Sequence, residues 1–191
     1  GGRSSGPVAF MRGADAVAGM IASGGSTRRA AKMVVMNIDH PDVLKFIRCK
    51  AEEEKKVRAF LEAGYNMYDL NDPAWNSIQY QNANNSVRVT DEFMQAVEDD
   101  EKFVTRFVRT GEVAQEYRAR DLMREIAEAA WESGDPGLQY DTTINKWHTC
   151  PNSGRITTSN PCSEYLHVDN SSCNLASINL LKYLNSDGTF N

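Results

Sequence analysis

Apolar residues at helical spacing open the chain. Residues 8–22 predict an amphipathic helix, and small residues are frequent within it, so that it can pack closely against a neighbour. That neighbour is either the same domain or a second copy of the protein, and the pattern leaves both open. The predicted apolar side consists of Phe10, Ala14, Val17 and Ile21.

A short apolar run and a second helical pattern follow. Residues 33–38 suit a buried strand. Pro41 predicts the start of a helix, because proline is tolerated in a first helical turn. Further on, the charged block at 52–56 predicts a solvent-exposed helical face, and we assign no role to Cys49 beside it. The buried side of this helix is predicted to consist of Val43, Leu44, Phe46 and Ile47.

Residues 64–89 are rich in asparagine, glutamine and aromatic residues, which favours turns and loops. Thr90 then predicts the cap of a short helix, and residues 102–108 predict a strand or an irregular segment. The clearest helix covers roughly 119–133 and ends at Gly134, with Leu122, Ile126 and Ala129 on its apolar side. A turn at 135–137, a short strand at 138–140 and a polar loop at 145–155 complete this part.

Helices therefore alternate with short apolar strands, which is typical of the α/β class. The length of 191 residues suffices for one domain with a substantial core. No internal repeat of about 20–50 residues is visible.

Composition excludes several classes of protein. Hydrophobic residues make up 41% and charged residues 25% of the chain, as in ordinary soluble proteins. The net charge of −5 gives no reason to expect nucleic-acid or membrane binding, and no apolar run or signal peptide indicates a membrane or secretory route. Four cysteines are too few for a disulfide scaffold, which favours a reducing cytoplasm. The first residues lack a methionine, and we expect an internal piece of a longer protein.

The candidate chemistry lies in the stretch Thr157–Tyr165. If it is extended, Asn160, Cys162 and Glu164 project to one side, because side chains alternate along a strand. Pro161 favours extension, since proline disfavours helix for the residue before it. A thiol beside a carboxylate is a poor polar nucleophile but suits a neutral hydrogen-atom donor, while the carboxylate can move protons.

The run Asn-Pro-Cys-Ser-Glu at 160–164, followed by Ser-Ser-Cys-Asn-Leu at 171–175, resembles the catalytic finger loop of ribonucleotide reductases. The separation of the two cysteines (173 − 162 = 11) resembles the adenosylcobalamin-dependent class. The resemblance implies part of a ten-stranded α/β barrel, in which the run Asn-Asn-Ser-Val-Arg-Val at 84–89 leads into a strand near the active site. Residues 1–31 would form an interface helix and a specificity loop, and residues 156–180 the finger loop and the strand that follows it.

The same resemblance implies roles for four residues. Cys162 would carry the thiyl radical that abstracts the ribose 3′-hydrogen, Glu164 would act as the general base, and Asn160 would position the substrate hydroxyls. Cys173 would be one of two redox-active thiols, with its partner upstream of Gly1. The implied cofactor is adenosylcobalamin, and an external dithiol such as thioredoxin would be the reductant.

The glycine-rich segment at 23–31 has two interpretations. It is either a helix cap with a solvated basic turn or a loop that approaches a nucleotide. Its sequence resembles that of the reductase specificity loop, which couples a bound deoxynucleotide effector to the choice of substrate. The resemblance thus implies a ribonucleoside di- or triphosphate substrate, a deoxynucleotide effector and a homodimer. The loop residues concerned are Ser26, Thr27, Arg28 and Arg29.

Three alternatives remain at this point. The first keeps the reaction but takes the radical from a metal-containing partner subunit, as in class I reductases. The second is a non-catalytic nucleotide-binding or oligomerisation domain with buried cysteines. The third is a zinc module, although zinc sites usually show closely spaced cysteine pairs. Its ligands would come from His148, Cys150, Cys162, His167 and Cys173.

Overall fold

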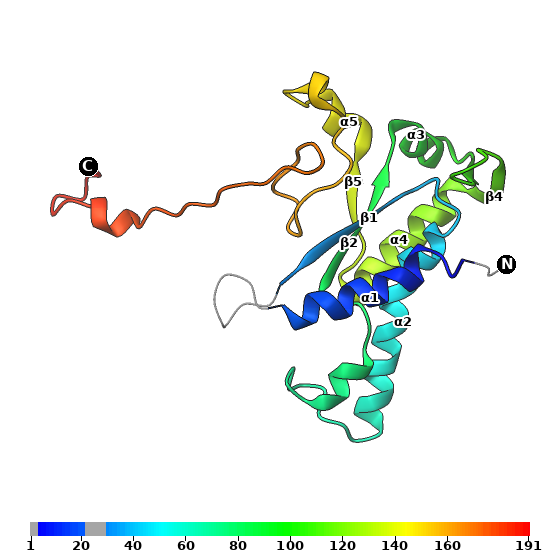
Figure 1. The fold of residues 1–191 in the computed structure, drawn as a ribbon, viewed down its shortest axis with the longest axis horizontal. Coiled ribbons are helices and arrows are strands. Elements are labelled where there is room, and N and C mark those ends of the chain that lie inside the picture. The colour runs from blue at the N-terminus through cyan, green and yellow to red at the C-terminus, as the bar shows by residue number, and fades with distance from the viewer. Residues whose placement is uncertain (1–3, 22–29) are drawn as a thin grey trace.

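A computed structural model describes residues 4–21 and 30–191 of the chain (Figure 1). The predicted specificity-loop residues Ser26, Thr27, Arg28 and Arg29 lie outside these ranges. The elements are α1 (Pro7–Met20), β1 (Lys32–Asn37), α2 (Val43–Glu62), the 3-10 helix η1 (Pro73–Ser77), β2 (Ala83–Val89), α3 (Asp91–Asp99), β3 (Lys102–Arg106), β4 (Val113–Arg118), α4 (Ala119–Ser133), β5 (Gly137–Tyr140), α5 (Asp141–Lys146), and the 3-10 helices η2 (Pro151–Ser153) and η3 (Leu180–Tyr183).

Three parallel strands form the central sheet, with β2 between β1 and β5. The register places Val35 of β1 opposite Ser86, and Val87 opposite Leu138 of β5. Parallel neighbours need a crossover that returns the chain to the same end of the sheet, and α2 and α4 lie in the two crossovers. Strands β3 and β4 form a separate antiparallel hairpin.

One face of the sheet packs against α2 and α4. The two helices contact each other, and their buried side chains join those of β2 in one hydrophobic cluster. Burial of each large apolar side chain contributes about 1.5–3 kcal/mol, so this cluster is the main stabilising feature of the fold. Its fully buried members include Phe46, Ile47, Val87, Val89, Phe93 and Leu122.

Most predicted elements are confirmed. β1 and β5 cover the predicted strands within a residue or so. The N–H of Phe93 donates to Oγ1 of Thr90 at 3.3 Å, which caps α3 as expected. Helix α4 covers the predicted range and ends at Gly134, where φ is 81° and glycine avoids strain. Among the described residues, no helix has the length and hydropathy needed to cross a membrane.

The predicted helix at 8–22 is confirmed as α1, and its predicted apolar side faces outward rather than into the same domain. Phe10 is 73% exposed and Val17 is 51% exposed. Polar contacts turn the opposite side inward, because Asp15 accepts a hydrogen bond from the N–H of Asn82 at 3.1 Å. Hydrophobic spacing does not detect such an anchor. The side chains that α1 buries are Val8, Met11, Asp15 and Ala18.

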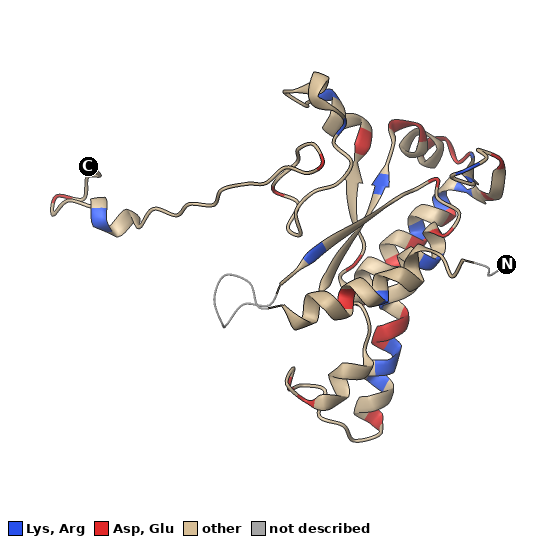
Figure 2. Cartoon of the chain, viewed as in Figure 1, with Lys and Arg blue, Asp and Glu red and all other residues tan. Residues whose placement is uncertain are grey.

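Two residues of α2 also depart from the prediction. Cys49 belongs to the core, where Asn85 Nδ2 lies 3.5 Å from its Sγ. Glu53 is 5% exposed and accepts the N–H of Gln79 at 3.0 Å, although its block was predicted to be solvated. Glu52, Lys55 and Lys56 of the same block are exposed, and charges of both signs lie along the helix (Figure 2).

The composition of 64–89 favoured loops, but the last part of this stretch is the central strand β2, in agreement with the strand that the resemblance implies there. Side chains of β2 alternate between the two faces of the sheet. Val87 and Val89 enter the helix-covered core. Asn84 and Arg88 have the opposite parity and contact the segment at 156–161 on the other face. This second face positions the candidate site.

The α/β class is confirmed, whereas the described residues form an open sheet and not a closed barrel. The strand expected at the end of 156–180 is not formed, and residues 171–179 extend away from the sheet without secondary structure (Figure 1). Leu175 is 80% and Ile178 is 70% exposed there. A strand requires a neighbour for its backbone hydrogen bonds, and this segment has none among the described residues.

Candidate active site

The predicted finger loop is a turn and not an extended strand. The N–H of Ser163 donates to the carbonyl oxygen of Asn160 at 3.0 Å and closes a four-residue turn around Pro161 and Cys162. Pro161 suits the second position of such a turn, because its fixed φ matches the value required there. The expectation that Asn160, Cys162 and Glu164 line one side of a strand is therefore wrong.

Asn160 holds the two arms of this turn together. Its N–H donates to the carbonyl oxygen of Tyr165 at 3.4 Å, and its Oδ1 accepts the N–H of Tyr165 at 2.9 Å. An amide side chain has one acceptor oxygen and an NH₂ donor. Because the oxygen is used within the loop, the Nδ2 of Asn160 is the group that can donate to a hydroxyl of a ligand.

The cysteines and the carboxylate of the predicted site are at the surface. Cys162 and Cys173 are exposed free thiols, and Glu164 is exposed. A hollow of about 550 Å³ lies beside the turn, and it is lined by both Asn160 and Cys173. Cys162 and Glu164 are not among its lining residues. The structure thus brings Asn160 and Cys173 to one hollow, whereas the other two residues lie in the turn region between Asn160 and Tyr165 and do not line it.

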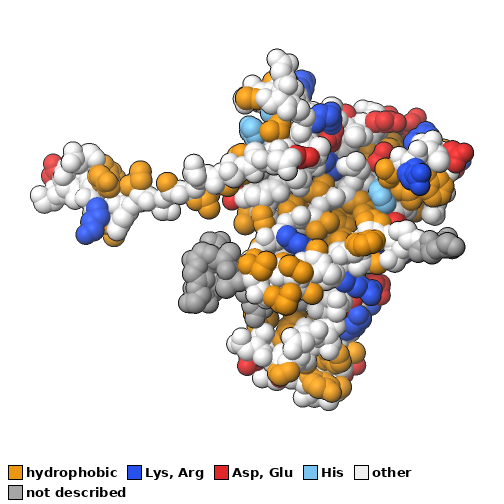
Figure 3. Space-filling view, in the orientation of Figure 1, with side chains coloured by type: hydrophobic (Ala, Val, Ile, Leu, Met, Phe, Trp, Pro, Cys, Tyr) orange, Lys and Arg blue, Asp and Glu red, His pale blue; other side chains and the backbone are white. Residues whose placement is uncertain are grey.

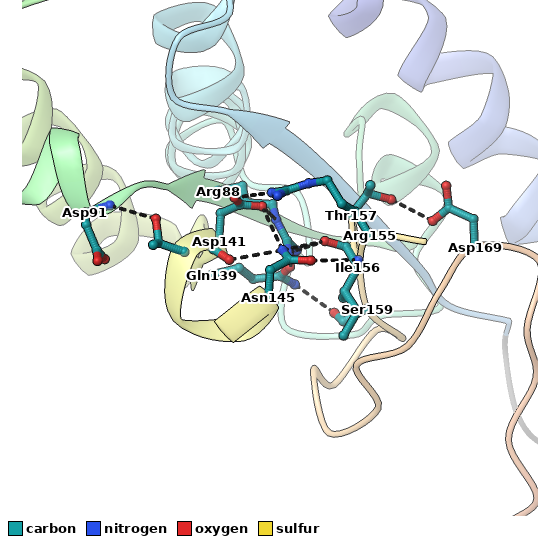
Figure 4. A network of polar contacts seen from close by, with 11 residues as sticks. Arg88, Asp91, Gln139, Asp141, Asn145, Arg155, Ile156, Thr157, Ser159 and Asp169 are labelled. Carbon is teal, nitrogen blue, oxygen red and sulfur yellow. Dashed lines mark hydrogen bonds and ion pairs between the residues drawn. The ribbon is translucent and has the colours of Figure 1, made fainter. Parts of the chain in front are cut away.

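A buried arginine of β2 anchors the segment that leads into the turn (Figure 4). Arg88 is 2% exposed, and its Nη2 donates to the carbonyl oxygen of Ile156 at 2.6 Å. Its Nε donates to Asp141 Oδ1 at 2.7 Å and its Nη1 to Gln139 Oε1 at 2.9 Å. Asn145 adds to this anchor, because its Oδ1 accepts the N–H of Ile156 at 3.0 Å. The guanidinium therefore ties β2, β5, α5 and the start of the loop together.

Asp141 is the counter-charge of this anchor. Burial opposes ionisation of its carboxyl group, but hydrogen bonds from Arg88 and Arg155 outweigh burial and lower its pKa. Arg155 Nη2 lies 2.5 Å from Asp141 Oδ2. The carboxylate is therefore ionised at neutral pH and balances the buried guanidinium, as buried charges require.

Two further side chains connect the anchor to the turn. Gln139 is 4% exposed, and its Nε2 donates to Ser159 Oγ at 2.7 Å. Ser159 Oγ donates to the carbonyl oxygen of Asn160 at 2.8 Å. From β2, Asn84 Nδ2 donates to the carbonyl oxygen of Pro161 at 2.6 Å. The turn that carries Cys162 is thus bound to the sheet at both of its first two residues.

No contact was assigned to any of these anchoring residues from the sequence. A partial signal was present at 86–89, where the polar residues Ser86 and Arg88 alternate with valines, which is typical of a half-buried strand. Gln139 lies at the same parity in the short strand β5, opposite Arg88 in the register.

Aromatic side chains pack together at the end of the turn region, around Tyr165. His167 stacks on Tyr165 with ring centroids 5.8 Å apart, and meets the ring of His148 edge-on at 6.0 Å. His148 and His167, which the zinc alternative requires, are thus neighbours. In the ranges that the structure describes, however, no group of three His, Cys, Asp or Glu side chains is placed to hold a metal ion.

A second hollow of about 340 Å³ lies at the carboxyl ends of the parallel strands. Arg88, Asp141 and Thr157 line it together with Asn37, which ends β1. Ligands of open parallel sheets bind at this edge. Thr157 also lines the hollow beside the turn, so the two hollows adjoin along the finger loop.

The arrangement suits chemistry on a hydroxylated ligand at the turn. An exposed thiol can give up a hydrogen atom or a proton, and a neighbouring carboxylate can accept a proton. The amide donor of Asn160 can hold a hydroxyl group. Because Cys162 lies at the tip of a narrow turn, a bulky reactant can reach its Sγ.

Comparisons with known proteins agree over the whole chain. Residues 1–191 match the family described as "Ribonucleotide reductase, barrel domain". The chain is 62% identical over 191 residues to the vitamin B12-dependent ribonucleotide reductase of Streptomyces coelicolor. It is 54% identical over 192 residues to the protein of the same description from Rhodopirellula baltica. Both alignments cover 100% of this chain, but only 20% and 18% of the relatives.

A more distant relative has a related description. The chain is 38% identical over 188 residues to the vitamin B12-dependent ribonucleoside-diphosphate reductase of Mycobacterium tuberculosis strain H37Rv, which covers 98% of this chain and 23% of that protein. The chain thus spans about a fifth of the length of the relatives that it matches.

Proposed function

The chain belongs to the ribonucleotide reductase barrel-domain family, and on this basis we propose that the protein reduces ribonucleotides to 2′-deoxyribonucleotides by adenosylcobalamin-dependent radical chemistry. The observation that carries the proposal is the turn at 160–163, which presents the Cys162 thiol beside Asn160 on an anchored loop. The class I alternative is not favoured, because the relatives described above are named as vitamin B12-dependent.

The residues of the turn divide the reaction between them. Cys162, as a thiyl radical, takes the hydrogen atom from C3′ of the ribose and later returns one. Glu164 accepts the proton of the 3′-hydroxyl, and the 2′-hydroxyl leaves as water after it takes a proton from the thiol pair to which Cys173 belongs. Asn160 holds the hydroxyls through its Nδ2, since its Oδ1 is already bonded to Tyr165.

Cys173 supplies reducing equivalents. Replacement of the 2′-hydroxyl by hydrogen requires two electrons and two protons, and two thiols that become a disulfide deliver both. The overall change is ribonucleotide plus dithiol to deoxyribonucleotide, disulfide and water. Cys173 is one of these thiols, with its partner outside this chain, and an external dithiol such as thioredoxin restores the pair. Its position on the hollow that Asn160 lines supports this role.

The residue of this chain that fits adenosylcobalamin chemistry is Cys162, because its thiol is accessible to a large group. Cys162 is free, exposed and at the tip of a turn, so a group as large as a corrin with its adenosyl ligand can approach it. When bound, adenosylcobalamin supplies a carbon-centred radical that can take a hydrogen atom from a thiol. Cys162 is the residue of this chain that would meet it.

Assembly and regulation follow from the same relationship. We propose a homodimer that uses the exposed side of α1, where orange side chains gather in the space-filling view (Figure 3). Phe10, Val17 and Met20 are 73%, 51% and 77% exposed there. We further propose that Ser26, Thr27, Arg28 and Arg29 respond to a deoxynucleotide effector, that the substrate is a ribonucleoside di- or triphosphate, and that the protein is cytoplasmic.

The deciding experiment is reductase activity of the full-length protein, purified alone, with ribonucleotides and a dithiol. We expect deoxyribonucleotide only when adenosylcobalamin is present. Cys162→Ser is expected to abolish turnover while nucleotide binding is retained. Product that forms only after addition of a metal-loaded second subunit would overturn the cobalamin assignment, and full turnover by Cys162→Ser would overturn the catalytic role of the thiol.

A further inference from the structure

Three side chains form a directed chain of hydrogen bonds from inside the sheet to the turn that carries Cys162 (Figure 4). Arg88 Nη1 donates to Gln139 Oε1 at 2.9 Å, and Gln139 Nε2 donates to Ser159 Oγ at 2.7 Å. Ser159 Oγ in turn donates to the carbonyl oxygen of Asn160 at 2.8 Å. Arg88 and Gln139 are 2% and 4% exposed, so the first link is shielded from solvent.

The donor and acceptor of each hydrogen bond are fixed because the chain of bonds begins at an arginine. Arginine has only donors, so Gln139 must turn its amide oxygen toward Arg88 and its NH₂ toward Ser159. The hydroxyl of Ser159 has one hydrogen, and the Asn160 carbonyl can only accept, so the hydrogen goes there. Ser163 Oγ is a second possible acceptor for this hydrogen, but it lies at 3.2 Å, farther than the 2.8 Å to the Asn160 carbonyl oxygen.

The end of the chain is the atom that closes the turn. The carbonyl oxygen of Asn160 accepts both the Ser159 hydroxyl and the N–H of Ser163. These two bonds fix the orientation of the peptide group that precedes Pro161. Because proline has a fixed φ, that orientation is passed on to Cys162.

We propose that Gln139, oriented by Arg88, is a positioning residue for Cys162. Its amide directs the Ser159 hydroxyl to the turn-closing carbonyl and so fixes where the thiol points. The inference rests on the proposed function, in which Cys162 exchanges a hydrogen atom with the substrate C3′. Such a transfer depends steeply on distance, and a displacement of about 1 Å can lower a rate roughly 100-fold.

Gln139→Glu tests the direction of the chain without a change of shape. The new carboxylate keeps the contact with Arg88 but offers Ser159 an acceptor in place of a donor. The Ser159 hydrogen then turns toward the carboxylate and is lost to the Asn160 carbonyl. Ser159→Ala removes the hydroxyl. Ser159→Thr keeps a hydroxyl at the same position and should therefore retain wild-type activity. Thr142→Ala is the matched control, since Thr142 Oγ1 accepts the N–H of Asp91 at 3.1 Å outside this chain of bonds.

The measurements are kcat and KM for ribonucleotide reduction by the full-length protein, its melting temperature, and deuterium uptake by peptides that cover 157–165. Gln139→Glu and Ser159→Ala are expected to lower kcat roughly tenfold or more, with KM and melting temperature near those of the wild type. Deuterium uptake in the turn should rise in both. Ser159→Thr and Thr142→Ala should match the wild type.

Two outcomes separate this inference from the proposed function. If the wild-type protein is active and Gln139→Glu has unchanged kcat, or loses kcat only in step with its melting temperature, the positioning role is overturned and the function stands. If the wild-type protein reduces no ribonucleotide, the proposed function fails. Deuterium uptake then decides alone, and unchanged uptake in Gln139→Glu overturns the positioning of the turn.

Discussion

Asn84 and Pro161, 77 positions apart in the sequence, are joined by a hydrogen bond of 2.6 Å from Asn84 Nδ2 to the Pro161 carbonyl oxygen. Asn84 lies in β2, at the parity that faces away from the helix-covered core. The carbonyl that it holds belongs to the peptide bond between Pro161 and Cys162. The central strand thus contacts the backbone directly beside the candidate radical-bearing residue, independently of the bonds that end at Asn160.

Asn84→Ala is therefore expected to loosen the turn. A neutral hydrogen bond contributes about 0.5–1.5 kcal/mol, so we expect a fall in kcat of up to about tenfold and little change in melting temperature. Deuterium uptake in 160–165 should increase. Asn71→Ala is the matched control, because Asn71 Nδ2 bonds to Asp69 Oδ1 at 3.2 Å within its own loop. Equal kcat and equal uptake in the two variants would refute the role of Asn84.

Arg88→Met is expected to destabilise the protein strongly. The substitution leaves the Asp141 carboxylate without its buried partner and removes the donor to the Ile156 carbonyl, and such losses cost about 3–5 kcal/mol. The expected result is a clear fall in melting temperature. Arg118→Met serves as control, since Arg118 and Asp100 form an ion pair at the surface, and we expect little change there. A melting temperature as high for Arg88→Met as for Arg118→Met would show that the buried guanidinium does not anchor the fold.

The lowered pKa of Asp141 gives the same anchor a pH dependence. A carboxyl group whose pKa is lower in the folded protein stabilises the fold fully above its unfolded pKa of about 3.9, and this contribution is lost as pH falls further. We expect the melting temperature of the wild type to fall more steeply than that of Asp141→Asn between about pH 5 and 3. Asp141→Asn should be less stable at pH 7. Parallel curves for the two proteins would contradict this prediction.

Cys49 should differ from the other cysteines in reactivity. Burial raises the pKa of its thiol to about 11, so the thiol is neutral at pH 8 and is also shielded by the core. We expect iodoacetamide to modify Cys49 far more slowly than Cys150, which is exposed. Peptide mass spectrometry measures both rates, and in denaturant the two should become equal. Comparable rates in the native protein would argue against burial of Cys49.

The sequence predicted local structure well where one face of a helix is purely apolar. Helix α4 has such a face, with Leu122 and Ile126 buried, and its bounds and orientation are confirmed. Helix α1 has apolar residues on more than one side, and a buried carboxylate, Asp15, decides which side turns inward. Hydrophobic spacing assigns no favourable value to a buried carboxyl group, so it could not decide whether the apolar side of α1 packs on its own domain or faces outward.

The site could be predicted in part. The residue types at Asn160, Cys162 and Glu164 pointed to radical and acid–base chemistry, but local reasoning mistook a proline turn for a strand. The hydrogen bonds that anchor the turn could not be predicted from the sequence, for a different reason. Arg88 meets partners that are 51, 53 and 68 positions away, and such contacts depend on strand order, which local sequence does not specify.

Variants that lack one of the two exposed thiols, Cys162 or Cys173, should be blocked at different steps of the proposed reaction. If Cys162 carries the radical that reaches C3′, as we propose, Cys162→Ser should give neither product nor release of 3′-tritium from a labelled ribonucleotide to water. Cys173→Ser retains Cys162 but lacks one of the two thiols that we propose supply electrons. Cys162 can then still take up the 3′-hydrogen and exchange it with solvent, so tritium release should persist. Deoxyribonucleotide formation should fall at least about 100-fold, because the variant lacks a group that takes part in the reaction itself. Cys150→Ser, which removes an exposed thiol outside the turn, should leave both readouts unchanged. Tritium release by Cys162→Ser, or multiple turnovers by Cys173→Ser with a dithiol, would require the two roles to be reassigned.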